Sequence, residues 1–282
     1  MIDLRQGDCL ELMKDIPDKS IDMILCDLPY GTTACKWDNV IPFEPLWEQY
    51  KRIIKDNGAI VLFGSEPFAS KLRLSNIKMY RYDWIWDKTR GTNFQNAHKM
   101  PMKSYENICT FYKKLPTYNP QMAEGKPYKT SAGFRKNTIE SLSERTLSDF
   151  EKSDLNNITN RSAIVSVYRS ETINNGVRFP LSILSYKKDC KLHPNAKPIS
   201  LLEYLIKTYT NENEVVLDNC AGSMSTAIAC LNTNRNGIMI EKDEHYFEVG
   251  CKRIKQHILD NNINLCYNQA KGGVIWQNLK IG

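Results

Sequence analysis

The chain has 282 residues, of which 41% are hydrophobic and 25% are charged, and its formal net charge is +6. This composition is typical of a folded globular protein with a sizeable core, and it excludes an intrinsically disordered or collagen-like chain. No apolar run approaches the roughly 20 residues of a membrane-spanning helix, and the first residues lack the basic and apolar segments of a secretory signal. We therefore expect a cytoplasmic protein.

Nine cysteines are scattered along the chain, and no two of them form a C-x-x-C pair. An odd number of dispersed thiols is typical of a reducing compartment, and it favours neither a disulfide framework nor a zinc site. We expect no bound metal.

The first predicted elements lie within residues 1–115. Residues 20–26 and 57–64 are short apolar runs that predict two buried strands. The amphipathic stretch 45–55 between them predicts a helix, which the Asn-Gly pair at 57–58 should end. Strand, helix and strand at this spacing form a βαβ unit, which implies a parallel sheet.

Residues 116–190 lack this alternation of predicted strands and helices and are rich in Asn, Ser, Thr, Lys and Pro, which predicts a loop-rich insertion. The α/β pattern then resumes. Its expected elements are a helix over 198–209, a strand over 214–217, a helix over 225–233, a strand over 237–240 and a helix over 244–258. Residues 1–115 and 191–282 should therefore form one doubly wound α/β domain, with residues 116–190 inserted into it.

Basic residues are concentrated in the middle of the chain. Residues 99–136 hold eight basic and two acidic side chains with aromatic residues between them, and a second basic run covers 161–191. Lys and Arg neutralise phosphates and aromatic faces stack on bases, so this composition suits nucleic acid, although a solvated basic surface has the same composition. The eight candidates for DNA contact are Lys99, Lys103, Lys113, Lys114, Lys126, Lys129, Arg135 and Lys136.

Polar sequences follow two of the predicted strands. DLPY at residues 27–30 follows the first strand, and DNCAGS at residues 218–223 follows the strand that begins at 214. Ligands bind at the carboxyl ends of parallel strands, so these two loops are expected neighbours in one site. The small residues at 221–223 allow the backbone to approach a ligand closely. Glu241 ends the next strand, a position suited to binding ribose hydroxyls.

Each of these short sequences is common in ordinary turns, and only their combination and order are specific. That combination resembles the amino-methyltransferases of DNA, which methylate N6 of adenine or N4 of cytosine. Residues 27–30 are similar to the family's catalytic Asp-Pro-Pro-Tyr, and residues 218–223 to its S-adenosylmethionine loop. HPNAKP at 193–198 matches the element that precedes the cofactor strand, and Gly-Asp at 7–8 matches the element before the catalytic strand. Further residues of the family pattern are Phe63, Gly64, Trp86, Asp87, Lys88 and Glu106.

The order of the motifs resembles the β group of this family, with the catalytic motif first, the recognition region in the middle and the cofactor loop last. The resemblance implies a Rossmann-like S-adenosylmethionine-dependent methyltransferase fold, with target recognition in residues 116–190. It implies transfer of a methyl group from S-adenosylmethionine to N6 of an adenine flipped out of double-stranded DNA. The natural setting is a bacterial or phage-encoded restriction-modification system, in which a homodimer or a cognate restriction nuclease is a further possible partner.

Three alternatives stay open. The first is methylation of cytosine N4, because an aspartate at the head of the tetrapeptide resembles the adenine-directed members only as a statistical preference. The second is a DNA-binding subunit with a degenerate cofactor site. The third is an RNA methyltransferase, against which the order of the motifs argues.

The resemblance also implies roles for the four residues of the catalytic tetrapeptide. The side chain of Asp27 and the backbone carbonyl of Leu28 would accept hydrogen bonds from the target amine. Pro29 would fix the turn that aims this carbonyl. Tyr30 would stack on the flipped base.

For the cofactor, the resemblance implies that Asp8 contacts the adenine end, Glu241 the ribose and Lys197 the carboxylate. Asp218 and residues 221–223 would shape the methionine pocket. The complete set of expected cofactor-binding residues is Asp8, Cys9, Asp27, Lys197, Asp218, Asn219, Cys220, Ala221, Gly222, Ser223, Glu241 and Lys242.

Two residues depart from the family pattern. Leu28 stands where the family usually has Pro, which leaves the backbone carbonyl in place as an acceptor. Met224 stands where the cofactor loop usually has a second Gly, so we expect its side chain to crowd the ligand or to oppose a positive φ.

Overall fold

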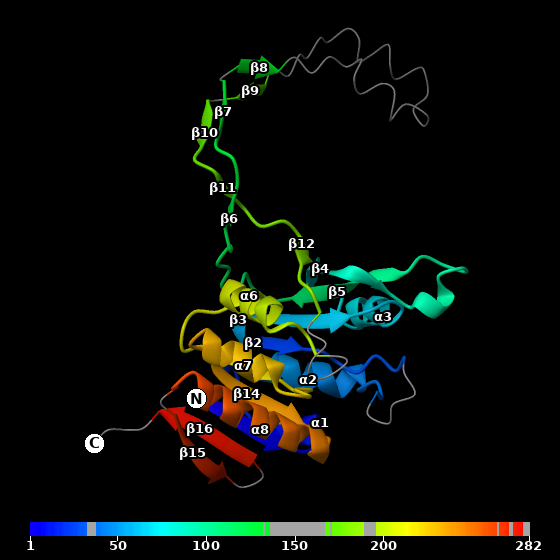
Figure 1. The fold of residues 1–282 in the computed structure, drawn as a ribbon, viewed down its shortest axis with the longest axis vertical. Helices are drawn as coiled ribbons and strands as arrows, with labels where there is room; N and C mark the ends of the chain where they lie inside the picture. The colour runs from blue at the N-terminus through cyan, green and yellow to red at the C-terminus, as the bar shows by residue number, and fades with distance from the viewer. Residues whose placement is uncertain are drawn as a thin grey trace. The chain divides into compact units, whose positions relative to one another are not determined.

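The structure is a computed structural model (Figure 1) that describes residues 1–32, 38–131, 133–135, 167–169, 171–188, 196–263, 265–270 and 273–278. The chain divides into two units, one of Met1–Gln121 with Leu181–Gly282 and the other of Met122–Pro180. Within the described ranges, none of the helices has the length and apolar character that crossing a membrane requires.

A ten-stranded sheet forms the centre of the first unit, in the order β12-β4-β5-β3-β2-β13-β14-β1-β16-β15. The strands from β3 to β1 in this order are parallel, whereas β5 and β16 run antiparallel to their neighbours. The sheet is therefore parallel at its centre and mixed at its flanks. The strands are β1 (Ile2–Gln6), β2 (Ile21–Cys26), β3 (Ile54–Gly64), β4 (Tyr80–Thr92), β5 (Lys103–Phe111), β12 (Ile183–Ser185), β13 (Val215–Asp218), β14 (Asn236–Glu241), β15 (Leu265–Ala270) and β16 (Gly273–Asn278).

Helices cover both faces of this sheet. Successive residues of a strand point to opposite faces, and accordingly Met23 and Leu25 join one buried cluster while Ile24 and Cys26 join another. The first cluster includes α6, α7 and α8, which Figure 1 shows stacked along the sheet, and the second includes α1, α2 and α3. The helices are α1 (Cys9–Leu12), α2 (Phe43–Ile53), α3 (Phe68–Ser75), α6 (Ile199–Tyr209), α7 (Ser225–Asn232) and α8 (Glu244–Asp260), with 3-10 turns η1 (Met13–Asp15) and η2 (Phe94–Asn96).

The expected end of the helix before β3 is wrong. Helix α2 ends at Ile53 and β3 begins at Ile54, so the Asn-Gly pair at 57–58 lies inside a strand. Close packing, and not a turn, requires glycine at this position. A Cβ at Gly58 would lie 2.7 Å from the Ile54 side chain and 2.8 Å from the Asp22 carbonyl oxygen. The expected strand at 57–64 begins three residues earlier, and the other expected helices and strands are present with ends shifted by at most two residues.

The carboxyl ends of the central strands bring the expected site residues to one edge of the sheet. β13 pairs with β2 on one side and with β14 on the other, and β14 also pairs with β1. The loops that follow these four strands begin at Asp27, Asn219, Lys242 and Gly7. Segments far apart in the sequence are thus neighbours at this edge.

The second unit is a succession of short antiparallel pairs. β6 (Ala123–Glu124) pairs with β11 (Val177–Arg178), β7 (Tyr128–Thr130) with β10 (Thr172–Asn174), and β8 (Gly133–Arg135) with β9 (Val167–Arg169). None of the hydrophobic side chains described in this unit is buried, and Ile173 and Phe179 are 64% and 72% exposed. The described part of this unit therefore lacks a core of its own.

Candidate active site

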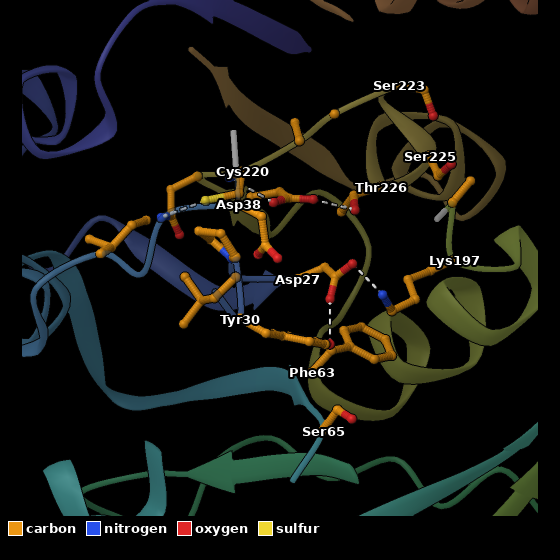
Figure 2. Close-up of a pocket in the computed structure, with 18 of the residues that line it drawn as sticks. Asp27, Tyr30, Asp38, Phe63, Ser65, Lys197, Cys220, Ser223, Ser225 and Thr226 are labelled. Atoms are coloured by element: carbon orange, nitrogen blue, oxygen red, sulfur yellow. Dashed lines mark hydrogen bonds and ion pairs between the residues drawn. The ribbon is translucent and has the colours of Figure 1, made fainter. Parts of the chain in front are cut away.

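A cavity of about 1050 Å³ opens at the carboxyl ends of β2, β13 and β14. Every residue predicted for catalysis or cofactor binding lines it. Figure 2 shows the two loops of this cavity facing each other, with Asp27 and Tyr30 on one side and Cys220 and Ser223 on the other. The structure therefore brings together the motifs that the sequence places almost 200 residues apart.

The loop after β2 holds the carboxylate of Asp27 in a defined orientation. The Tyr30 hydroxyl donates a hydrogen bond to Asp27 Oδ1 at 2.7 Å, and the Tyr30 ring stacks on Phe68 of α3 with the ring centroids 5.0 Å apart. Burial, together with the charge of Asp27, raises the pKa of Tyr30. The Tyr30 hydroxyl therefore stays protonated and acts as a donor to the carboxylate.

A second carboxylate fixes the turn beyond the tetrapeptide. Asp38 accepts hydrogen bonds from the backbone N–H groups of Gly31 at 2.8 Å and Thr32 at 2.9 Å. Gly31 has φ +66°, a conformation that favours glycine. The turn is thus held at both ends, by Tyr30 on Asp27 and by Asp38 on the following backbone.

Four charges of alternating sign extend from the loop after β2 across to β4 and β5; Asp27 is partly exposed, and the other three side chains are largely buried. The Lys197 ammonium pairs with Asp27 Oδ2 and lies 3.5 Å from Glu106 Oε2, and Lys88 Nζ lies 2.5 Å from Glu106 Oε1. Burial alone would lower the pKa of Lys197 and raise that of Glu106, but the ion pairs outweigh burial in both cases. Both groups therefore remain charged, and Lys197 lies against the Asp27 carboxylate.

Lys88 and Glu106 were not among the predicted site residues, although both belong to the family pattern. Both line the cavity, and their side chains are 10% and 13% exposed. Burial at this level is rare for charged residues unless they are paired. The sequence signal is therefore present at each residue. The pairing of Lys88 with Glu106 depends on the contact between β4 and β5, and that of Glu106 with Lys197 joins segments about 90 residues apart.

Two carboxylates, Asp218 at the end of β13 and Glu241 at the end of β14, have no cation within ion-pair distance in the part of the chain that the structure describes. Asp218 is 4% exposed and accepts hydrogen bonds from Cys220 N at 3.1 Å and from the Thr226 hydroxyl at 2.6 Å. Burial raises the pKa of Asp218 to about 6, although both hydrogen bonds act in the opposite direction.

Glu241 closes the same end of the cavity. Its Oε2 accepts from Gly222 N at 2.7 Å and its Oε1 accepts from Asp243 N at 2.8 Å. Burial also raises the pKa of Glu241. A Cβ built on Gly222, which has φ +50°, would meet nothing within 4 Å, so the backbone of the loop lies open to a ligand.

The rim and the floor of this end come from β1 and α1. Asp8 caps α1 by accepting from Leu10 N at 2.9 Å, and its other oxygen pairs with Lys242 Nζ at 3.0 Å near the surface. Cys9 is buried, and its thiol interacts with that of Cys220. The floor is therefore apolar, with exposed charge at the rim.

Comparisons with known proteins identify this arrangement. Residues 21–252 match the model of the N6/N4 DNA methylase family. The chain belongs to this family. It is 26% identical over 289 residues to the type II methyltransferase M.HinfI of Haemophilus influenzae, covering 89% of this chain and 67% of the relative. It is also 26% identical over 262 residues to the DNA adenine methyltransferase YhdJ of Escherichia coli, covering 88% and 81%.

Solved structures of DNA methyltransferases share the fold. The complex of M1.HpyAVI with S-adenosylmethionine gives a TM-score of 0.57 at 22% identity, covering 90% of this chain and 100% of the other. The cytosine-N4-specific PvuII DNA methyltransferase gives a TM-score of 0.59 at 16% identity, covering 93% and 88%. The expected methyltransferase fold is therefore confirmed, and the protein is a DNA methyltransferase, whose substrate is DNA.

Within this DNA methylase, the departure at Met224 has a different outcome from the one expected. Met224 adopts φ +62°, but its side chain is fully buried and does not line the cavity. It packs on Gly250 of α8, where a Cβ would lie 2.2 Å from Met224 Cγ. The expected crowding of the ligand is wrong, because the absence of a side chain at Gly250 gives Met224 space in the core.

Leu28 lines the cavity of this DNA methylase but is largely buried. It is 3% exposed and belongs to the cluster that packs on α2 and α3. A Leu at this position therefore contributes both to the core and to the wall of the cavity.

The DNA methylase's basic residues predicted to contact DNA are distributed over both units. Lys103 lines the cavity, and burial lowers its pKa. Lys113 and Lys114 instead lie near Asp56, 3.7 and 3.2 Å from its carboxylate oxygens. Of the others, Lys99 belongs to the first unit, and Lys126 and Lys129 belong to the second. The side chain of Arg135 is not described, and Lys136 lies outside the described residues. Residues 193–195 of the HPNAKP element also lie outside them.

Proposed function

We propose that the protein transfers a methyl group from S-adenosylmethionine to N6 of adenine in double-stranded DNA. The observation that carries this proposal is one shared cavity, in which the Asp27 carboxylate faces the backbone loop that follows Asp218. The relative YhdJ is named as a DNA adenine methyltransferase, which favours adenine.

The residues present fit S-adenosylmethionine. Glu241 and Asp8 offer carboxylate oxygens for the ribose hydroxyls and the adenine amine, and the open backbone at Gly222 allows close approach. Asp218 and Glu241 have no cation within ion-pair distance among the described residues, so their negative charge suits a cationic ligand. When bound, the cofactor supplies an electrophilic methyl group on a sulfonium centre.

The protein's own residues prepare the nucleophile. An exocyclic amine is a poor nucleophile because its lone pair is delocalised into the base. Asp27 and the carbonyl of Leu28 accept hydrogen bonds from the two N–H groups of the target amine. These hydrogen bonds favour a pyramidal nitrogen with a localised lone pair. Lys197 and Tyr30 hold the Asp27 carboxylate for this purpose.

The target base must leave the duplex to reach this carboxylate. The side of Tyr30 that lines the cavity then receives the base, while Phe68 supports its ring. Residues 116–190, which include the second unit, supply target recognition through their basic and aromatic side chains. A homodimer or a cognate restriction nuclease is a further partner, in the cytoplasm of a bacterium or a phage-infected cell where the DNA lies.

Methylation of cytosine N4 is the second candidate, because the cytosine-N4-specific PvuII enzyme has the same fold. Nucleoside mass spectrometry separates the two. Unmethylated duplex DNA incubated with the protein and S-adenosylmethionine should yield N6-methyladenine. N4-methylcytosine would overturn the choice of base, and no methylated base from folded protein would overturn the proposal.

A further inference from the structure

The hairpin of β4 and β5 carries exposed apolar side chains beside the cavity. Its connecting residues 93–102 include Phe94, which is 79% exposed, and Met100, which is 52% exposed. Such neighbouring apolar exposure marks a binding surface more often than isolated exposed residues do. The roles assigned above to the catalytic and cofactor residues leave this hairpin without a function.

The base of the hairpin is fixed to the rim of the cavity. Thr92 and Lys103 are cross-strand partners that both line the cavity, and the Thr92 hydroxyl donates to the Lys103 carbonyl at 2.8 Å. The Lys103 ammonium bonds to the hydroxyl of Ser65, which follows β3 and also lines the cavity. Asn93 is the last cavity residue before the tip, so Phe94 directly follows the rim.

The tip is an ordered turn. Asn93 has φ +69°, and its carbonyl and side-chain oxygens accept from the backbone and the side chain of Asn96 at 3.0 and 2.7 Å. Ala97 N donates to the Phe94 carbonyl at 3.0 Å. Lower in the hairpin, Met102 packs where Gly91 has no side chain, since a Cβ there would lie 2.3 Å from Met102 Cε. The turn therefore presents the Phe94 ring from a fixed backbone.

The charge around the tip identifies the partner. Arg90 and Lys99, one on each side of the tip, are exposed, and residues 88–105 contain no Asp or Glu. An exposed aromatic ring within a purely basic segment is complementary to stacked bases between phosphates. The hairpin also adjoins the cavity that must receive a base extruded from the duplex.

We propose that this hairpin enters the duplex beside the target base, and that Phe94 fills the space in the base stack that the base leaves on rotating into the cavity. The proposal rests on the proposed function. A wedge of this kind offsets the cost of unstacking, so it accelerates methylation most where the target is firmly paired and stacked.

The test compares paired with weakened targets. Phe94→Ala is assayed on a duplex that contains a site mapped from wild-type methylation, and on the same duplex with the target base mismatched. Because extrusion is easier from a mismatch, the variant should lose about 10- to 100-fold in kcat/KM on the matched duplex and less than about 3-fold on the mismatch. Phe94→Trp should retain activity on both duplexes.

Leu74→Ala is the matched control, because Leu74 on α3 is 73% exposed and does not line the cavity. It should leave both rates unchanged. Full activity of Phe94→Ala on the matched duplex would overturn the proposal. Equal losses on both duplexes would also overturn it. A changed oligomeric state with unchanged methylation would overturn it too, and would assign the tip to contact with a protein partner.

The wild-type rate separates the two levels of inference. If wild-type protein does not methylate DNA, the proposed function is refuted, and the proposed role of Phe94 is refuted as well. Wild-type methylation with an unaffected Phe94→Ala variant refutes the wedge alone. Target-site 2-aminopurine supplies a second readout, because its fluorescence should rise with wild-type protein and rise less with Phe94→Ala.

Discussion

The two ends of the cavity, the proposed catalytic end at Asp27 and the proposed cofactor end at Asp218 and Glu241, both use carboxylates, but they hold them differently. At the catalytic end, Asp27 is paired with the buried cation of Lys197. At the cofactor end, Asp218 and Glu241 are held by backbone N–H groups and a hydroxyl. An ion pair keeps a carboxylate charged and aimed, whereas neutral donors orient it and leave its negative charge uncompensated. The first arrangement suits a fixed hydrogen-bond acceptor, and the second suits binding of a cation.

Replacing Asp27 should have the largest effect. Asp27→Ala removes the acceptor for the target amine but leaves Asp218 and Glu241 in place, so methylation should fall by at least about 10³-fold. Affinity for S-adenosylmethionine, measured by calorimetry, should stay within about 3-fold. Loss of both methylation and S-adenosylmethionine binding, with an intact fold, would contradict the separate roles of the two ends.

Lys197→Met tests which end the cation serves. The resemblance implies a contact with the cofactor carboxylate, whereas the structure pairs Lys197 with Asp27 and Glu106. We expect kcat to fall about 10- to 100-fold, because the Asp27 carboxylate loses its partner, with the Kd for S-adenosylmethionine changed less than about 3-fold.

Lys197→Arg is the conservative control, since it keeps the positive charge. It should restore part of kcat, and the pH profile of kcat should return towards that of the wild type. A large rise in Kd with unchanged kcat would instead assign Lys197 to the cofactor end.

Acidification should weaken cofactor binding. Burial raises the pKa of Asp218 to about 6, so the group is ionised above this pH and becomes protonated as pH falls below it. A cation binds the ionised form, and the Kd for S-adenosylmethionine should therefore rise about tenfold between pH 7 and pH 5. Asp218→Asn should flatten this dependence. A Kd that is independent of pH in wild-type protein would show that the charge of Asp218 does not contribute.

The sequence located both ends of the cavity because their signals are local. Each motif follows an apolar strand directly, and parallel strands bring their carboxyl ends to one edge. It did not locate the pairing of Lys197 with Asp27, which are 170 residues apart in the chain. Nor did it give the antiparallel flanks of the sheet, because strand pairing depends on contacts between distant segments.

Met224 is a single residue whose environment also depends on a contact that the sequence alone does not predict. The expected conflict with the ligand follows from the loop sequence alone, but the outcome depends on Gly250 in α8. The Asn-Gly pair at 57–58 is a second case, since a strong turn signal lies inside β3, where Gly58 is closely packed against Ile54 and the backbone of Asp22. In both cases tertiary packing overrides a local preference.

Met224→Gly should have the smallest effect on the site. The side chain lies outside the cavity, so the Kd for S-adenosylmethionine should change less than about 3-fold. Stability should fall, because emptying the space beside Gly250 costs about 2–5 kcal/mol and relief of the positive φ returns only about 1 kcal/mol. Thermal unfolding should therefore show a Tm lower by roughly 5–10 °C.

Gly250→Ala is the matched variant for Met224→Gly. A Cβ at Gly250 would meet the Met224 side chain, so in the wild-type background Gly250→Ala should destabilise the protein. Combined with Met224→Gly, the added methyl group should instead fill part of the vacated space and recover stability. Additive losses in the double variant would show that the two residues do not share this space. A large gain in cofactor affinity on Met224→Gly would show that the side chain does reach the ligand.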